Sequence, residues 1–245
     1  TDESGPRLVW NSGLGSSVRC LGMLECYYLM RDSSEFTSEL HRKILKIFLG
    51  HSRYLYDNHI QQYSPSNFQA SATCWLVFAG IMLPEFTEAG QWLRVAVERL
   101  KERAERNFES DGAQVEQCPQ YHLAGLRDIA RPILLMHLNG CDALSADAGL
   151  WQKLRRIFEY PVHIAHSTGH LGLFNSGVYG TEWQAFLPLG WRLFRSPLLG
   201  WAAARFIQDG FVPVAKDVSK FVAFMGDDWV VALKEARRLG LSEPP

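Results

Sequence analysis

Tyr121 and His122 stand next to each other at the end of the segment FESDGAQVEQCPQYH, residues 108–122. Both side chains can carry protons, and a phenol does so in catalysis when its neighbours lower its pKa from the usual value of about 10. The pair follows Pro119, and a proline here favours the first turn of a helix, where the helix dipole is positive. The segment therefore predicts either a catalytic acid–base pair or an ordinary capped turn, and these residues alone do not separate the two.

Two acidic residues of this segment have structural as well as chemical uses. Asp111 and Gly112 form a turn signal at a helix end, and Glu116 precedes the next helix, whose N-terminus a carboxylate stabilises. Asp111 and Glu116 are also the pair that could serve a glycoside hydrolase, which needs two carboxylates about 5–10 Å apart. Both residues fit a loop-stabilising role.

Two other segments carry candidate groups. Asn67, in SPSNFQAS, precedes an apolar run and fits either an ordinary helix N-cap or an amide donor to a substrate. His163, His166 and His170 recur at intervals of four or less, which suggests a metal site. However, no carboxylate or cysteine nearby completes a ligand set, and the pattern is not HExxH. Loop or core positions are therefore expected for these histidines.

The composition excludes several classes of protein. The 245 residues are 47% hydrophobic and the net charge is −1, so a sizeable core is expected and no basic surface for nucleic acid or an anionic membrane. The longest apolar runs are shorter than the roughly 20 residues that cross a bilayer. The sequence contains no GxSxG, P-loop or GxGxxG motif. Five scattered cysteines favour buried thiols over a disulfide framework.

Helical spacing of apolar residues continues from residue 14 to about residue 139. We expect a central helix after Asn67, an amphipathic helix starting at Pro84, and a helix from about Pro119 that Pro132 kinks or divides. Short helices are expected at 183–195 and 198–206. From Gly210, two Val/Phe-rich runs predict a β-hairpin, followed by a last helix in WVVALKEARRLGL. The fold class is thus mainly α: an incomplete (α/α) toroid of antiparallel helix hairpins in residues 1–205, with the beginning of a β domain in residues 206–245.

Three motifs, in order, resemble those of the heparinase II/III-type polysaccharide lyases. They are SNFQA (66–70), LPEFTEAGQWL (83–93) and DGAQVEQCPQYH (111–122). Upstream, Trp10 and Arg19 are similar to the family's "W…R" helix. Downstream, GLFNSG is similar to its "fnDs" loop, and the hairpin from Gly210 to the entry strand of its β-sandwich domain.

The chain departs from the family pattern at three positions. Phe68 stands where many members have histidine, Asn175 replaces the usual aspartate, and Cys118 replaces a serine. A His-rich segment of the family's β domain would follow about where the chain ends. The resemblance therefore implies that this chain holds part of the family's site, with the remaining β domain or a second subunit as a partner.

The resemblance implies cleavage of a uronate-containing polysaccharide, such as a heparan-type glycosaminoglycan or alginate, by β-elimination. Asn67 would neutralise the substrate carboxylate. Tyr121 would donate a proton to the leaving oxygen and is the candidate for the abstracting base, with His122 positioning it or sharing the proton work. By resemblance the protein is expected in the periplasm or outside the cell.

Substrate-binding groups are expected among the polar residues around the same motifs: Glu116, Gln117, Arg127, His170 and Asn175. Arg127 and Arg131 would favour a sulfated polymer. Trp75, Trp92 and Trp183 could supply faces that stack on a sugar, although packing in the helical core is expected for Trp75 and Trp92. No cofactor is expected within this chain, although the resemblance leaves room for a metal in the β domain. The alternatives are a non-catalytic carbohydrate-binding fragment and a glycoside hydrolase on the same toroid.

Overall fold

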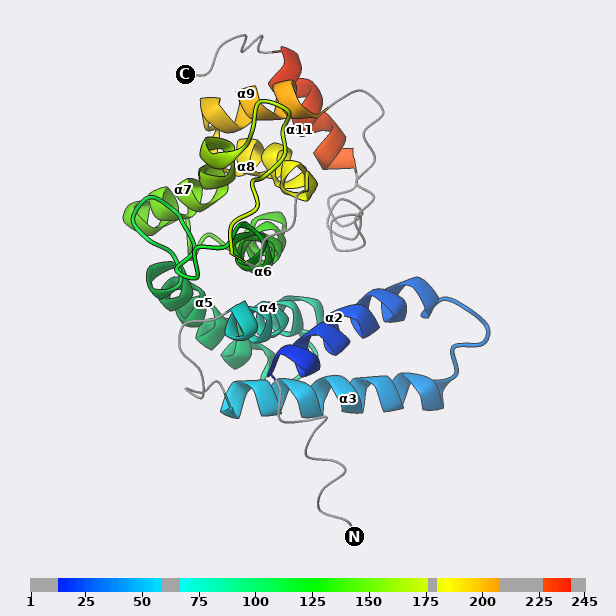
Figure 1. Cartoon of the computed structure of the whole chain (residues 1–245). Coiled ribbons are helices and arrows are strands. Elements are labelled where there is room, and N and C mark those ends of the chain that lie inside the picture. The colour runs from blue at the N-terminus through cyan, green and yellow to red at the C-terminus, as the bar shows by residue number, and fades with distance from the viewer. Residues whose placement is uncertain (1–12, 59–66, 176–179, 208–226, 239–245) are drawn as a thin grey trace. The chain divides into compact units, whose positions relative to one another are not determined.

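The computed structural model describes residues 13–58, 67–175, 180–207 and 227–238, and within these ranges the regular elements are helices (Figure 1). The chain forms two compact units. The first comprises residues 1–103 and 135–144, and the second residues 104–134 and 145–245. No helix in the described ranges is long and apolar enough to cross a membrane.

The first unit is built around a central helix, as the sequence predicts. Helices α2 (Gly13–Met30), α3 (Ser38–Asp57) and α4 (Asn67–Met82) pack against one another (Figure 1). Residues 70–79 of α4 are all buried, because this helix is apolar on every side. At its centre, the indole N–H of Trp75 donates to the Ser52 hydroxyl at 2.9 Å, and the ring packs against Phe48.

Helix α5 (Ala89–Arg106) begins later than Pro84, so the predicted start is wrong. Residues 83–88 form turns instead, in which the amide of Phe86 bonds to the Leu83 carbonyl at 3.2 Å and the amide of Ala89 to the Phe86 carbonyl at 3.0 Å. These short-range bonds replace the helical pattern. Beyond the turn, α5 lies close to α4, since a Cβ on Gly80 would come within 2.7 Å of the Leu93 Cβ.

Arg99 of α5 closes the C-terminal end of α3. Its guanidinium donates to the Leu55 carbonyl at 3.1 Å and to the Tyr56 carbonyl at 2.7 Å. The last carbonyls of a helix have no partner within the helix, so these bonds satisfy two of them. Burial lowers the pKa of Arg99 to about 10. The guanidinium is therefore a charged clamp between two helices of the first unit.

The second unit begins at Ala104, near the end of α5, and contains most of α6 (Pro119–Leu138) and all of α7 (Ala148–Ile164). Helix α6 begins at Pro119, as predicted. It is continuous through Pro132, so the expected division of this helix is wrong. One proline removes a single backbone donor, and buried Ile129, Ile133 and Leu134 hold the helix around it. Asp147 caps α7 by accepting from the Leu150 amide at 3.0 Å.

Four short elements complete the second unit: η1 (Glu182–Phe186), α8 (Leu187–Phe194), α9 (Pro197–Phe206) and α11 (Asp227–Arg238). The short helices predicted at 183–195 and 198–206 are confirmed, as is the last helix. Trp229 of α11 donates to the Ala185 carbonyl at 3.1 Å, and Arg237 donates to the Ile207 carbonyl at 2.6 Å. The predicted β-hairpin lies outside the described residues, and the domain boundary at 205/206 stays a prediction.

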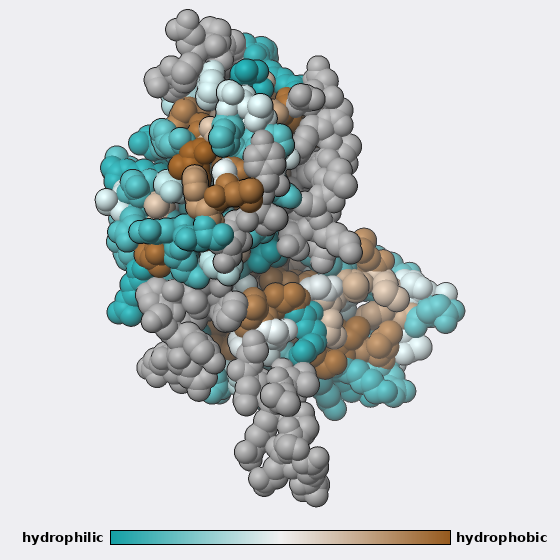
Figure 2. Space-filling model, in the orientation of Figure 1, coloured by the Kyte–Doolittle hydropathy of each residue, from teal (hydrophilic) through white to brown (hydrophobic). Residues whose placement is uncertain are grey.

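Hydrophilic and hydrophobic residues are both exposed on the described surface. On the face that Figure 2 shows, hydrophobic groups lie over α2 and α3. Val18, Leu29 and Met30 of α2 and Leu40 of α3 are the large hydrophobic residues that these two helices expose. The five cysteines are free thiols, and Cys20, Cys74 and Cys118 are buried, as expected for small core residues.

Candidate active site

The loop between α5 and α6 is held by its own hydrogen bonds. The amide of Glu109 bonds to the Ala113 carbonyl at 2.7 Å, and Phe108 and Gln114 form an antiparallel bridge. The Asp111 carboxylate accepts from the Ala113 amide at 2.9 Å. Such a side chain-to-backbone bond is typical of an Asx turn. The turn predicted from Asp111 and Gly112 is therefore present.

Gly112 allows this loop to lie directly on helix α7. Its φ of 94° is in the left-handed region, and a Cβ there would come within 2.3 Å of the Arg156 carbonyl oxygen. The Arg156 guanidinium in turn donates to the Ser110 carbonyl at 3.0 Å. Only glycine fits both the conformation and the close approach. The loop is thus fixed to α7 on one side and to its own backbone on the other.

Glu116 and Gln114 bond to each other twice. The Gln114 side-chain amide donates to the Glu116 carboxylate at 2.8 Å, and its oxygen accepts from the Glu116 backbone amide at 2.7 Å. Gln114 is buried while Glu116 is exposed. Asp111 and Glu116 therefore each have a partner inside the loop. This pairing favours the loop-stabilising role for Asp111 and Glu116 over a hydrolase carboxylate pair.

Gln117 joins this loop to a distant segment, because its carbonyl accepts from the Asn175 side-chain amide at 2.8 Å. Both residues have left-handed backbones, with φ values of 51° and 50°. Non-glycine residues in this region are strained and concentrate at functional sites. The next residue, Cys118, is buried, and its carbonyl accepts the first helical bond, from the His122 amide at 2.8 Å.

Tyr121 is the third residue of α6 and is half-buried. Its hydroxyl forms no hydrogen bond with any part of the chain that the structure describes. The first turn of a helix carries unsatisfied N–H groups and the positive end of the helix dipole. Tyr121 thus belongs to this first turn, and its hydroxyl can bond to a ligand without breaking a bond to the described chain.

The His122 side chain lies in the core and is 1% exposed. Its Nε2 lies 3.0 Å from the Ile157 carbonyl of α7. A carbonyl only accepts, so Nε2 carries the hydrogen and Nδ1 is left as an acceptor, which has no partner among the described residues. Burial lowers the pKa of His122 to about 4, against the opposing effects of the Ile157 bond and the Asp111 carboxylate. The imidazole is thus neutral at neutral pH.

The remaining candidates of the second unit lie in other environments. Arg127 pairs with the buried carboxylate of Asp128 at 3.2 Å. The ring of His170 lies 3.2 Å from the Thr168 hydroxyl, and its backbone carbonyl bonds to the His166 amide. Within the described ranges, no group of three or more His, Cys, Asp or Glu side chains could hold a metal ion. In the first unit, Asn67 begins α4; its side chain and Trp10 lie outside the description.

The three tryptophans considered for stacking on a sugar have no exposed ring face. Trp75, Trp92 and Trp183 are all fully buried, and the Trp183 indole donates to the Gly169 carbonyl at 2.9 Å. Phe174, in contrast, is 51% exposed and directly precedes Asn175. Sequence reasoning did not single out Phe174, although its place in the GLFNSG motif was a usable signal.

Tyr160 is a neighbour of His122 that the sequence analysis did not predict. Its ring centroid lies 4.9 Å from that of His122, and the His122 centroid also lies 5.7 Å from that of Phe108. Burial, and to a smaller degree the charge of Asp111, raises the pKa of Tyr160. No local pattern connects Tyr160 with His122, because they belong to different helices.

These helices and this loop match a known family. The family model for the heparinase II/III N-terminus matches residues 2–183, so the chain belongs to the heparinase II/III family, as the motifs predicted. Heparin-sulfate lyase from Bacteroides stercoris is 25% identical over 139 residues, which is 57% of this chain and 20% of that protein. Heparin-sulfate lyase from Pedobacter heparinus is 25% identical over 124 residues, 51% of this chain and 18% of that protein. The chain thus spans about a fifth of the length of these curated relatives.

Solved structures show the same fold. A crystal structure of heparinase III matches with a TM-score of 0.69 and 21% identity, covering 78% of this chain and 30% of that one. The heparan sulfate lyase structure from Pedobacter heparinus matches with a TM-score of 0.63 and 19% identity, over 82% of this chain and 32% of that one. The expected fold class, an incomplete helical toroid, is therefore confirmed.

Proposed function

We propose that this chain is the helical part of a polysaccharide lyase that cleaves a uronate-containing polysaccharide by β-elimination. Family membership and the heparin-sulfate lyases among its relatives support a lyase acting on an acidic polysaccharide. The observation that carries the proposal is the place of Tyr121. Tyr121 lies in the N-terminal turn of α6, and its hydroxyl has no partner in the described structure. The preceding loop is held by Arg156, by Asn175 and by its own Gln114–Glu116 bond.

In the proposed reaction, a base removes the C5 proton of a uronate and the substituent at O4 leaves with a proton. Negative charge moves onto the substrate carboxylate as C5 loses its proton. An amide donor, for which Asn67 is the candidate, would stabilise that charge. Tyr121 protonates the leaving oxygen and is also the candidate base. The positive end of α6 stabilises negative charge close to the phenol.

His122 takes the positioning role in this proposal. A neutral, buried imidazole bonded to the Ile157 carbonyl fixes the first turn of α6 to α7, and with it the neighbouring Tyr121. Glu116, Gln117 and Asn175 hold the loop that leads into this turn. Arg127 and His170 remain proposed contacts to the acidic polymer.

The test is a lyase assay on the full-length protein and on this chain, with heparan sulfate, heparin and alginate as substrates. The readout is the ultraviolet absorbance of the unsaturated product. Tyr121→Phe is expected to reduce turnover roughly 100-fold or more, the size of a lost general acid–base contribution. Tyr27→Phe is the matched control, since it removes a half-buried phenol hydroxyl from an aromatic cluster of the first unit.

Three results would contradict the proposal. Near-normal turnover of Tyr121→Phe would remove Tyr121 from the reaction. New reducing ends without the unsaturated product would indicate hydrolysis. Binding of the polymers by the full-length protein, without any product, would indicate a carbohydrate-binding protein.

A further inference from the structure

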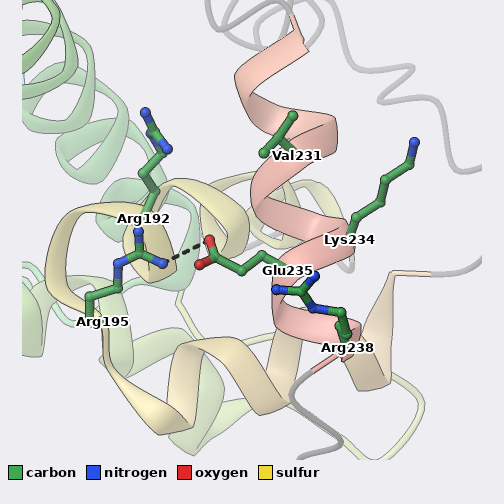
Figure 3. A pocket seen from close by; sticks show the side chains of 6 residues that line it. All are labelled: Arg192, Arg195, Val231, Lys234, Glu235 and Arg238. Atoms are coloured by element: carbon green, nitrogen blue, oxygen red, sulfur yellow. Dashed lines mark ion pairs between the residues drawn. The ribbon is translucent and has the colours of Figure 1, made fainter.

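Helices α8 and α11 of the second unit line an open groove of about 470 Å³ (Figure 3). Its volume lies within the range of about 300–1,000 Å³ that is typical of ligand sites. Four cationic side chains, one carboxylate and one apolar residue line it: Arg192, Arg195, Lys234, Arg238, Glu235 and Val231. A cationic groove is notable in a chain whose net charge is −1, because only a local cluster of this kind can attract an anion.

The lining residues come from two helices. The four on α11 are spaced by three and four positions, so they lie on one face of that helix. Figure 3 shows Glu235 reaching from this face toward Arg195, while Lys234 extends away from that pair. Lys234 and Arg238 are one turn apart, a rise of about 6 Å. Two cationic side chains, Lys234 and Arg238, therefore follow one another along α11.

Arg195 is already paired. Arg195 contacts the Glu235 carboxylate at 2.8 Å, and this bond lowers the pKa of Glu235, so the pair remains ionised. Lys234 and Arg238 form no ion pair with any described residue, and both are exposed. These two side chains are the ones that a bound anion can contact without breaking the existing pair.

Arg195 is also held in an unusual conformation. It ends α8 with a φ of 50°, a left-handed cap position where glycine is preferred. Its guanidinium lies over the Trp191 ring, 5.4 Å from the ring centroid. The backbone conformation of this turn favours glycine and so does not explain an arginine at position 195. The ion pair with Glu235 and the position in the groove do explain it.

We propose that the groove between α8 and α11 binds the anionic groups, sulfate or carboxylate, of an acidic polysaccharide, as a polymer contact in addition to the residues of the proposed reaction. The choice of polymer rests on the proposed function. Guanidinium groups bind sulfate-like and carboxylate anions through two parallel hydrogen bonds. Cations placed one helical turn apart suit a polymer with anions on successive units better than a single small anion.

The experiment measures binding of the full chain to fluorescently labelled heparan sulfate and alginate oligosaccharides at several salt concentrations. The variant Lys234→Ala/Arg238→Ala is expected to bind about tenfold more weakly, with a smaller salt dependence, because two exposed charge contacts are lost. The matched control is Arg42→Ala/Lys46→Ala, which removes the same charge from exposed positions of α3. Weaker binding of both polymers means that carboxylates suffice, and weaker binding of heparan sulfate alone identifies sulfate; both results support the groove.

Three outcomes would overturn the groove. The first is an unchanged affinity of the Lys234→Ala/Arg238→Ala variant, and the second is an equal loss of affinity in the control variant. The third is binding of duplex DNA that is as tight as binding of the polysaccharide and is weakened as much by the Lys234→Ala/Arg238→Ala variant, which would indicate a general polyanion surface. A failure of the groove proposal can be distinguished from a failure of the proposed function. Tyr121→Phe tests the reaction by product formation, whereas the groove variant is tested by affinity and needs no turnover.

Discussion

The side-chain amide of Asn175 donates a hydrogen bond to the backbone carbonyl of Gln117 at 2.8 Å, and both residues have left-handed backbones. The bond joins two segments 58 positions apart in the sequence. Gln117 lies two residues before helix α6, so the bond acts on the loop that presents Tyr121. Asn175 therefore has a structural reason to be asparagine, because an aspartate at this position has no donor for the carbonyl.

Asn175→Ala is expected to lower the free energy of unfolding by about 1–2 kcal/mol, since alanine loses the bond and tolerates the left-handed backbone poorly. Asn175→Gly loses the same bond but accepts the conformation, so it should be less destabilised than Asn175→Ala. Urea unfolding of the two variants measures the difference. Equal stability of both variants would show that the backbone conformation at this position carries no strain.

Gly112→Ala is expected to destabilise the protein by about 3 kcal/mol, because its Cβ would meet the Arg156 carbonyl and its backbone would be strained. Gly50→Ala is the matched control, in an exposed helical position with no atom within 4 Å of the added Cβ. That change should stabilise α3 by about 0.5–1 kcal/mol. Thermal or urea unfolding distinguishes the two, and a stable Gly112→Ala variant would contradict the close approach of the loop to α7.

His122 makes the stability of the protein depend on pH. It takes up a proton near pH 6.5 when unfolded but only near pH 4 in the fold, because burial disfavours the charged ring. His122 therefore does not reduce the free energy of unfolding above about pH 6.5. The free energy of unfolding falls as the pH drops toward 4, by about 3 kcal/mol in total.

His122→Gln removes this titration and should flatten the dependence of the unfolding free energy between pH 6.5 and pH 4. Urea unfolding at several pH values in this window gives the measurement. His163→Gln, at an exposed position of α7, is the control and should keep the wild-type slope. An unchanged slope in His122→Gln would mean that another group causes the pH dependence.

Phe174→Ala is expected to raise the KM for the polysaccharide roughly 3- to 10-fold, with little change in stability, if its exposed ring packs on a sugar. Leu173→Ala, at the neighbouring exposed position, removes a similar apolar group without a ring. The readout is the KM of the full-length protein for a uronate polymer in the lyase assay of the proposed function. The same increase in both variants would indicate a general hydrophobic contact rather than stacking.

Several features of the fold were predictable from local sequence. Pro119 starts α6 because its fixed φ suits the first helical position, and α4 is central because it is apolar on every side. The start of α5 was not predictable in this way. Pro84 is compatible with both a first helical turn and a non-helical turn, and the observed bonds of Phe86 and Ala89 select the latter.

Some features of the candidate site were likewise predictable from local sequence, and others were not. The sequence by itself determined the motif residues, the turn at Asp111–Gly112 and the family, because these depend on residue types at short spacing. Only the tertiary structure decided that His122 is buried and bonded to the Ile157 carbonyl, that Asn175 holds Gln117, and that α8 and α11 form one cationic groove. These relationships join residues more than thirty positions apart. Chain folding, rather than local preference, brings such residues together, so no local pattern predicts them.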